Sequence, residues 1–405
     1  MRKKSIFIAA VLCFMLMAVP VMVQASEEEA TSLVEQAVAL MEAGEYEDAL
    51  VPLLEAVEMG DVSAQNLLGN FYRNGYGVEQ DVEEAARYYQ LSADQGNIPA
   101  KYNLAFCYLE GTGVKKDVKK ADELLRDCAA QGDVESQFAL GYLYLDGKEL
   151  KQNYEDAVKY LQLAADQKNA PACYYLGLCF ENEWGVEQDY EKAAEYYNLA
   201  ADQGIVDALY SLGLLYQLGN GVEQDYEKAF EYYSLAAEQD YPEALTGLGY
   251  LYGQGLGTEQ DYEKMLKYYN QAVELGEPMA QFNLGCCYRD ATGVEQDYEE
   301  MLKYFRKSAN QGNANAQFNL GFSYYIGQGV DIDYEKAFKL FQQSAEQGFP
   351  VAVFAVGDCY YLGNGVDQDL EEAASWYQQA LDAGYEPDET DHEHLVAVLG
   401  EGYIR

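Results

Sequence analysis

The sequence is poor in basic residues, proline and histidine. Its 405 residues include 26 lysines and arginines against 69 aspartates and glutamates, which gives a formal net charge of −43. So acidic a surface repels phosphate backbones and anionic lipid, which argues against nucleic acid and membrane surfaces as partners. A basic partner is favoured, although an acidic surface can equally serve solubility alone. With 49% hydrophobic residues and only 8 prolines, the chain is too apolar to be disordered.

The first 25 residues have the features of a secretion signal. Arg2, Lys3 and Lys4 precede an apolar run from Ile6 to Val23, and Val23-Gln24-Ala25 offers small residues where a signal peptidase cleaves. We expect cleavage after Ala25 and a mature chain outside the cytoplasm, secreted or in the cell envelope or periplasm, without a membrane span. The alternative is an uncleaved anchor, because the run is close to the shortest length that spans a bilayer.

A 36-residue period runs through the rest of the chain. The stretch GVEQDYEKA occurs at Gly185–Ala193 and again at Gly221–Ala229. Its aspartate recurs without an insertion at Asp81, Asp117, Asn153, Asp189, Asp225, Asp261, Asp297, Asp333 and Asp369. Nine full repeats therefore run from Asp61 to Gly384, and a period of this length indicates a solenoid, a propeller or an array of small modules.

Each repeat has the pattern of two amphipathic helices. In the repeat Ile205–Asp240, both halves place apolar residues at helical spacing. Gly219-Asn220-Gly221 ends the first helix, because glycine adopts a positive φ without steric cost, and Asp225 caps the second. One hairpin cannot bury its own apolar stripe, so the hairpins must stack, and stacking requires constant spacing.

A glycine recurs in the middle of the first helix, where it costs about 1 kcal/mol relative to alanine. It stands at Gly69, Gly141, Gly177, Gly213, Gly249, Gly285, Gly321 and Gly357, with Ala105 as the exception. We expect a neighbouring helix to approach closely at these positions. An aromatic residue from a pair such as Tyr196-Tyr197 or Tyr232-Tyr233 would fill the space left by the missing side chain.

The repeats resemble those of the Sel1-like family, relatives of the tetratricopeptide repeats with a longer, glycine-bearing loop. The shared pattern is A-x-x-x-L-G-x-x-Y-x-x-G-x-G-V-x-x-D-Y-x-K-A-x-x-Y-Y-x-x-A-A, and it covers Asp61–Gly384. The resemblance implies an all-α fold, a right-handed α/α superhelical solenoid of stacked helix hairpins whose first helices line a concave groove. It also implies a non-enzymatic adaptor that binds other proteins.

The ends and three loops depart from the pattern. Residues 26–60 resemble a tetratricopeptide-type hairpin that would cap the solenoid, and residues 385–405 would form a C-terminal cap or tail. Glu149-Leu150, Glu183 and Ala291 replace the usual loop residues, so the shape of these three loops could differ.

The cysteines do not follow the pattern of disulfide-stapled members of this family. Cys128 and Cys173 lack partners at the matching positions of neighbouring repeats. Four others share one position on the first helix but never occur in adjacent repeats: Cys107, Cys179, Cys287 and Cys359. We interpret them as small buried packing residues, with a redox role for Cys286-Cys287 as the alternative.

The sequence offers no convincing catalytic, cofactor or metal site. The carboxylates recur at repeat positions, which favours helix surfaces and caps over acid–base pairs. The two histidines, His392 and His394, form an H-x-H, but alternate residues diverge on a helix and hold a metal poorly. The Gly-x-Gly loops lack a following Lys-Ser/Thr and so are not phosphate-binding loops. We therefore expect no enzyme, no cofactor and no bound metal.

The partner is expected in the groove of the first helices. Positions about 200–300° round the helix from the packing alanine should face it. The candidate residues are Tyr102, Asn103, Tyr174, Tyr175, Tyr210, Phe282, Asn283, Phe318 and Asn319. Asparagines could bond a peptide backbone while aromatics anchor its side chains. Two alternatives stay open: these residues could instead pack within the solenoid, or the ligand could be a glycan or cell-wall polymer, because aromatics also stack on sugars.

Overall fold

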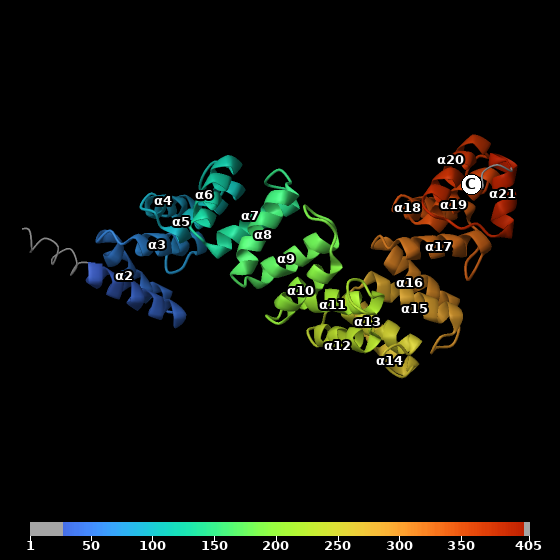
Figure 1. Ribbon diagram of the computed structural model, residues 1–405, viewed down its shortest axis with the longest axis horizontal. Coiled ribbons are helices and arrows are strands. Elements are labelled where there is room, and N and C mark those ends of the chain that lie inside the picture. The colour runs from blue at the N-terminus through green and yellow to red at the C-terminus, as the bar shows by residue number, and fades with distance from the viewer. Residues whose placement is uncertain (1–26, 401–405) are drawn as a thin grey trace, which may run out of the picture. The chain divides into compact units, whose positions relative to one another are not determined.

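The computed structural model describes residues 27–400, so the expected secretion signal lies outside the described residues. After a helix over residues 27–42, the helices are α2 Tyr46–Glu58, α3 Val62–Asn74, α4 Val82–Ala93, α5 Ile98–Glu110, α6 Val118–Ala130, α7 Val134–Asp146, α8 Tyr154–Asp166, α9 Ala170–Glu181, α10 Tyr190–Ala201, α11 Val206–Leu218, α12 Tyr226–Ala237, α13 Pro242–Gln254, α14 Tyr262–Glu274, α15 Pro278–Asp290, α16 Tyr298–Asn310, α17 Ala314–Ile326, α18 Tyr334–Ala345, α19 Pro350–Leu362, α20 Leu370–Asp382 and α21 Glu389–Leu399. Every regular element between residues 27 and 400 is thus a helix, and the expected all-α fold is confirmed (Figure 1).

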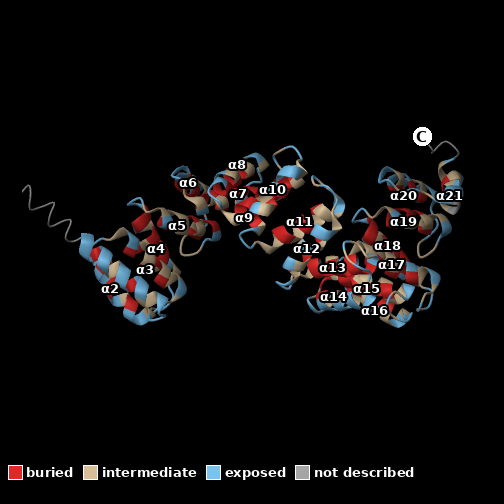
Figure 2. Ribbon diagram, turned by 60° about the horizontal axis from the view of Figure 1, so that its bottom comes forward, coloured by how far each residue is buried: buried red, intermediate tan, exposed pale blue. Residues whose placement is uncertain are grey.

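The helices form stacked hairpins in two compact units, one up to Gln203 and one from Gly204. The odd-numbered helices α3 to α19 are the first helices of the repeats, and the even-numbered helices α4 to α20 are the second helices. Within a unit, each first helix packs against the second helix of its own repeat, and each second helix packs against the next first helix. Buried residues lie between the packed helices, and exposed residues cover the outer surfaces (Figure 2).

The GVEQD motif closes the loop between the two helices of a hairpin. Gly219 ends α11 in the left-handed conformation with φ of 76°. The side-chain amide of Gln224 then donates to the carbonyl of Gln217 at 2.8 Å, and the Asp225 carboxylate accepts from the backbone N–H of Lys228 at 3.0 Å. The same glutamine bond recurs at Gln80, Gln152, Gln188, Gln260, Gln296 and Gln368.

The second loop glycine fixes each loop against the preceding repeat. A Cβ at Gly257 would lie 2.2 Å from the carbonyl oxygen of Tyr226, at the start of the previous second helix. Only glycine fits there, because φ is also positive at 66°. The motif therefore makes contacts in two repeats at once, which accounts for its repetition.

In seven of the eight repeats that carry it, the mid-helix glycine makes room for an aromatic ring, as expected; in the third repeat Gly141 lies against Leu161. A Cβ at Gly213 would lie 2.5 Å from the ring of Tyr233, the second residue of its tyrosine pair. The opposite edge of the same ring lies against Gly247 of the next repeat, where a Cβ would be 2.8 Å away. In the repeat that carries Ala105 instead, the aromatic position holds the smaller Leu125.

Two of the three atypical loops keep the usual backbone shape, so that part of the expectation was wrong. Glu183 and Ala291 adopt φ of 60° and 58°, the left-handed conformation that glycine adopts in the other repeats. The backbone bonds that close the helix end, from Trp184 N–H to the carbonyl of Cys179 and from Thr292 N–H to that of Cys287, accompany this geometry even where the residue is not glycine. Glu149 is not among the residues with positive φ, so the loop of the third repeat does differ.

The terminal helices pack onto the adjoining repeats. Ala37 from the helix over residues 27–42 and Leu53 of α2 share a buried cluster with Leu68 of α3. At the other end, Leu395 of α21 is fully buried against α19 and α20. Of the helices that the structure describes, none combines the length and apolarity needed to cross a bilayer.

Candidate functional site

The nine residues expected to line the groove are all half-buried on first helices, and none is freely exposed. Four of their six aromatic members pack against the aromatic residue that the mid-helix glycine admits. Ring centroids are 5.7 Å apart for Tyr210 and Tyr233 and 5.8 Å apart for Phe282 and Phe305. Tyr174 and Phe318 make the same contact, with Tyr197 and Phe341 respectively. This helix position therefore contributes to packing within the repeat.

Two of the asparagines bond within the solenoid. The side-chain amide of Asn103 donates to Asn66 Oδ1 at 2.9 Å, which links α5 to α3. Asn319 Oδ1 accepts from Arg289 at 2.7 Å, and its amide donates to the carbonyl of Asn315 at 2.8 Å. These bonds join neighbouring first helices, so both side chains have structural partners before any ligand binds.

An aromatic surface does form in the first unit, partly from other residues: a pair of rings on α5 and a cluster that spans α7 and α9. We call it the aromatic face and define it as Tyr102, Phe106, Phe138, Tyr142, Tyr174 and Tyr175 on α5, α7 and α9. Tyr175 joins α9 to α7, with its ring centroid 5.2 Å from Tyr142 and 6.0 Å from Phe138. On α5, Tyr102 and Phe106 lie 4.9 Å apart.

The sequence analysis missed Phe106, Phe138 and Tyr142. Phe106 and Tyr142 lie four residues after an aromatic residue on the same helix, and such pairs share one helix face. The i, i+4 aromatic spacing was therefore the available signal. Residues at the position of Tyr142 are also the more exposed ones: Tyr142, Tyr250 and Phe322 have exposed fractions of 38%, 40% and 43%.

On α7 and α9, the surroundings of the aromatic face are acidic, whereas α5 carries Lys101 beside Tyr102. Neither α7 nor α9 contains a lysine or arginine, whereas Glu135, Asp146 and Glu181 lie on these two helices. Burial raises the pKa of Tyr102, and the negative charges of Glu135 and Asp133 raise it further. The face thus combines aromatic rings with a negative potential, which suits cationic and apolar side chains.

The cysteine thiols are poor nucleophiles. The seven cysteines in the described part of the chain are unpaired thiols, and the four that share a helix position are buried, which confirms their packing role. Burial raises the pKa of Cys286 to about 11 and that of Cys287 to about 12. Both thiols are therefore protonated at neutral pH, which disfavours a redox role for this pair.

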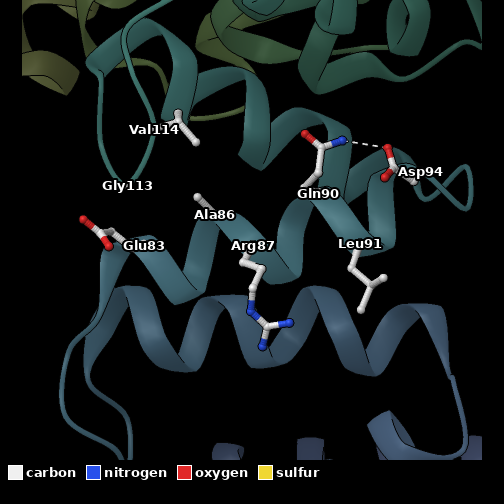
Figure 3. A pocket seen from close by; sticks show the side chains of 8 residues that line it. All are labelled: Glu83, Ala86, Arg87, Gln90, Leu91, Asp94, Gly113 and Val114. Atoms are coloured by element: carbon white, nitrogen blue, oxygen red, sulfur yellow. Dashed lines mark hydrogen bonds between the residues drawn. The ribbon is translucent and has the colours of Figure 1, made fainter.

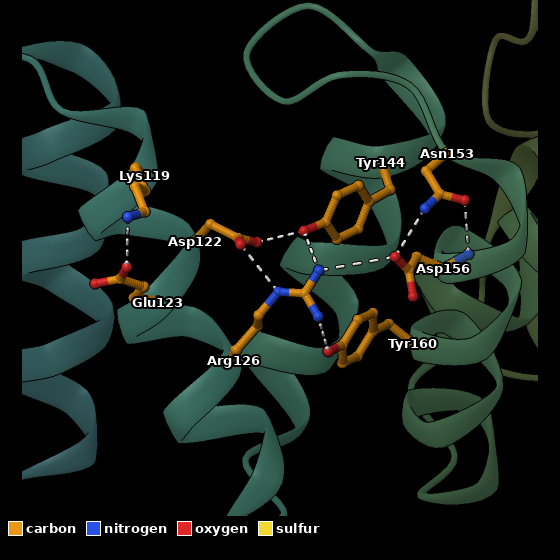
Figure 4. Close-up of polar contacts among 8 residues, drawn as sticks. All are labelled: Lys119, Asp122, Glu123, Arg126, Tyr144, Asn153, Asp156 and Tyr160. Carbon is orange, nitrogen blue, oxygen red and sulfur yellow. Dashed lines mark hydrogen bonds and ion pairs between the residues drawn. The ribbon is translucent and has the colours of Figure 1, made fainter.

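The largest polar network joins the second and third repeats. Arg126 of α6 donates to Asp122 at 2.9 Å, to Tyr144 at 2.6 Å and to Tyr160 at 3.1 Å (Figure 4). Asp156 lies 3.7 Å from the same guanidinium. Every partner is a side chain of α6, α7 or α8, so the network holds three helices together.

An open depression lies on the second-helix side of the first repeat. Glu83, Arg87 and Leu91 of α4 line it together with Gly113 and Val114 from the next loop (Figure 3). Arg87 is already paired with Glu84 at 2.7 Å, so no set of free polar groups converges on the depression.

His394, one of the two histidines in the tail, lies 2.9 Å from Asp358, and its ring centroid lies 4.7 Å from that of Tyr361. Among the described side chains, no three His, Cys, Asp or Glu residues gather as a metal site.

Comparisons with known proteins agree with the series of nine helix hairpins described above. The Sel1 repeat family model matches nine consecutive segments: 62–97, 98–133, 134–169, 170–205, 206–241, 242–277, 278–313, 314–349 and 350–385. A search of curated proteins gave no match.

Two solved structures are similar over most of the chain. One is c5321, a protective antigen present in uropathogenic Escherichia coli strains. It is 27% identical, with a TM-score of 0.64, over 93% of this chain and 92% of that one. The other is a Sel1 repeat protein from Oxalobacter formigenes, 33% identical with a TM-score of 0.59, over 74% of this chain and 87% of that one.

Proposed function

Because the chain belongs to the Sel1 repeat family, we propose that it is a non-enzymatic scaffold that binds a protein or peptide partner on its first helices. Repeat solenoids of this kind generally mediate protein–protein interaction. The aromatic face is the observation that supports this role best, since aromatic anchors with partly exposed rings dominate many protein interfaces.

The preferred partner is a basic segment with apolar side chains. Lysine and arginine side chains pack over tyrosine rings within this protein, as Lys228 does over Tyr216 at 4.7 Å. The aromatic face offers similar rings, but α7 and α9 contain no lysine or arginine that could pack over them. A partner could supply the missing cation, and Glu135, Asp146 and Glu181 would add attraction at the edges.

A glycan or cell-wall polymer is the alternative ligand. Sugar sites combine an aromatic platform with amides or other polar groups beside it. Here the nearest amides, Asn66, Asn70 and Asn103, lie on α3 and α5 and bond to one another or to Tyr89. This arrangement favours a protein partner over a sugar.

We place the protein outside the cytoplasm, on the strength of residues 1–25. The E. coli relative is described as a protective antigen, which is compatible with exposure to the outside. Fractionation of cells that express the full chain tests this location. Mature protein in the medium or envelope supports it, and an uncleaved chain in the cytoplasm contradicts it.

Capture with the chain from residue 26 onward tests the binding role. The bait is incubated with envelope and medium fractions, and bound proteins are identified by mass spectrometry. Tyr142→Ala should lose the main partner, whereas Tyr250→Ala, at the same helix position and equally exposed, serves as the matched control. Equal capture by the two variants would contradict the assignment of the aromatic face, and capture of polysaccharide alone would favour the glycan.

A further inference from the structure

We propose that a second surface, the loop edge of the second and third repeats, binds the acidic loop edge of another copy of this chain. The basic edge consists of Lys115, Lys116, Lys119, Lys148 and Lys151. The acidic edge consists of Glu223, Glu259 and Glu295, in the loops of the fifth, sixth and seventh repeats. This contact goes beyond the scaffold role and uses no residue of the aromatic face.

The basic edge inverts the charge that the other repeats carry. Lys115 and Lys151 occupy one repeat position, and at that position the other seven repeats have Glu79, Glu187, Glu223, Glu259, Glu295, Asp331 and Asp367. At the position of Lys119, the other eight repeats have glutamate. In a chain of net charge −43, the charge is thus inverted at three residues, which occupy two repeat positions in the second and third repeats.

Lys119 and Lys116 stand where the other repeats carry residues that stabilise the fold. Among the second helices α4 to α20, α6 alone has no acidic residue in its first turn, where Lys119 stands instead. A positive charge at a helix N-terminus opposes the helix dipole, so this placement is unfavourable. Lys116 also replaces the glutamine that closes the loop in seven other repeats.

The five lysines are accessible, and the two loops that carry most of them are in contact. Lys116 Nζ lies 2.5 Å from Glu149 Oε2, which joins the loops of the second and third repeats. Lys148, next to Glu149 in the chain, pairs with Asp146 at 2.8 Å, and Lys151 follows in the same loop. All five side chains are exposed, and Lys119 pairs only with Glu123 of its own helix, at 3.6 Å (Figure 4). Such exposed pairs are weak and can exchange for an external carboxylate.

A second copy provides a matching acidic edge. Glu223, Glu259 and Glu295 are exposed at the same loop position as Lys115 and Lys151, on hairpins of the same length. Two adjacent basic loops of one copy can therefore face two adjacent acidic loops of another at equal spacing. The Lys116–Glu149 pair shows within the chain that a loop lysine and a loop glutamate meet.

The contact is heterologous, because different surfaces of the two copies meet, and it can therefore extend to a third copy. The lysine–glutamate pairs of this contact act at short range. The repulsion between the two acidic chains acts over longer distances, and salt screens it beyond a Debye length of about 8 Å at 0.15 M. Glutamate at Lys115, Lys119 and Lys151 restores the residue type of the other repeats and the favourable sign at the start of α6. The reversed variant should thus fold at least as well as the natural chain.

Sedimentation velocity of the chain from residue 26 onward tests the proposal at about 0.15 M salt. The wild type should sediment faster as its concentration rises, whereas K115E/K119E/K151E should stay monomeric with an unchanged or higher melting temperature. The matched control K267E/K303E/K339E makes the same change in charge on second helices away from the loops, and it should associate like the wild type.

A charge swap completes the test. E223K/E259K/E295K should also stay monomeric, and mixing it with K115E/K119E/K151E should restore a complex. A wild type that remains monomeric at every concentration would overturn the proposal, as would equal association of the wild type and the lysine-reversed variant. Binding of an acidic peptide or inorganic polyphosphate to the basic edge without self-association would also reject the second copy as its occupant.

Discussion

Replacing Gly213 by alanine tests whether ring packing outweighs helix propensity in this fold. By propensity alone, alanine in mid-helix should stabilise the protein by about 1 kcal/mol. The new Cβ would lie 2.5 Å from two ring atoms of Tyr233, and Gly247 prevents the ring from retreating on its other side. Overpacking of this kind costs about 1–3 kcal/mol. Because the ring is confined at both edges, we expect the upper part of that range, and a net loss of about 1–2 kcal/mol.

Urea unfolding followed by circular dichroism measures the effect, and an unchanged slope shows that the variants unfold alike. Gly253→Ala on α13 is the matched control, because its Cβ would meet only the flexible end of Met265. That variant should be neutral or up to about 1 kcal/mol more stable. In a Tyr233→Leu background, which imitates the natural pair of Ala105 and Leu125, the cost of Gly213→Ala should shrink. A Gly213→Ala protein more stable than the wild type would refute the reasoning.

Three further changes probe the loops, the caps and the amides. Ala291→Gly should raise the stability by about 0.5–1 kcal/mol, because glycine adopts φ of 58° without strain, and a lower melting temperature would contradict this. The pKa of Asp189 is lowered, chiefly because its carboxylate accepts a hydrogen bond from the backbone N–H of Lys192. The stability that the ionised carboxylate contributes is therefore fully present above the unfolded pKa of 3.8 and is lost as pH falls through the folded pKa. Asp189→Asn should therefore keep the cap, and its stability should fall less steeply than that of the wild type as pH drops below 3.8. An unchanged dependence of stability on pH would reject this. Asn319→Ala should lower the melting temperature by removing the acceptor of Arg289, and an unchanged melting curve would assign the amide to ligand binding instead.

The sequence predicted the repeat and its packing well, because these depend on local spacing. The cap at Asp225 and the close approach at Gly213 follow from residue types that tolerate only one arrangement. The aromatic face was harder to predict, because it depends on how side chains lean. Helical side chains tilt toward the N-terminus, so the ring of Tyr142 covers surface one turn before its own Cα. Tyr142 lies only about 40° from Phe138 round the helix axis, so the angular criterion allowed it, but the expectation named only the two positions nearest the start of each first helix.

The loop glycine that contacts the preceding helix has a consequence for how such a chain changes over generations. Gly257 is fitted to Tyr226 of the repeat before it, and every repeat except the third, which has Glu149, carries a glycine at this position. Duplicating or deleting a whole 36-residue segment of the gene therefore leaves every junction complete, whereas a single inserted codon would spoil two junctions. Length is thus free to vary in whole repeats, and the identical stretches at Gly185–Ala193 and Gly221–Ala229 are what a duplication of that kind would leave behind.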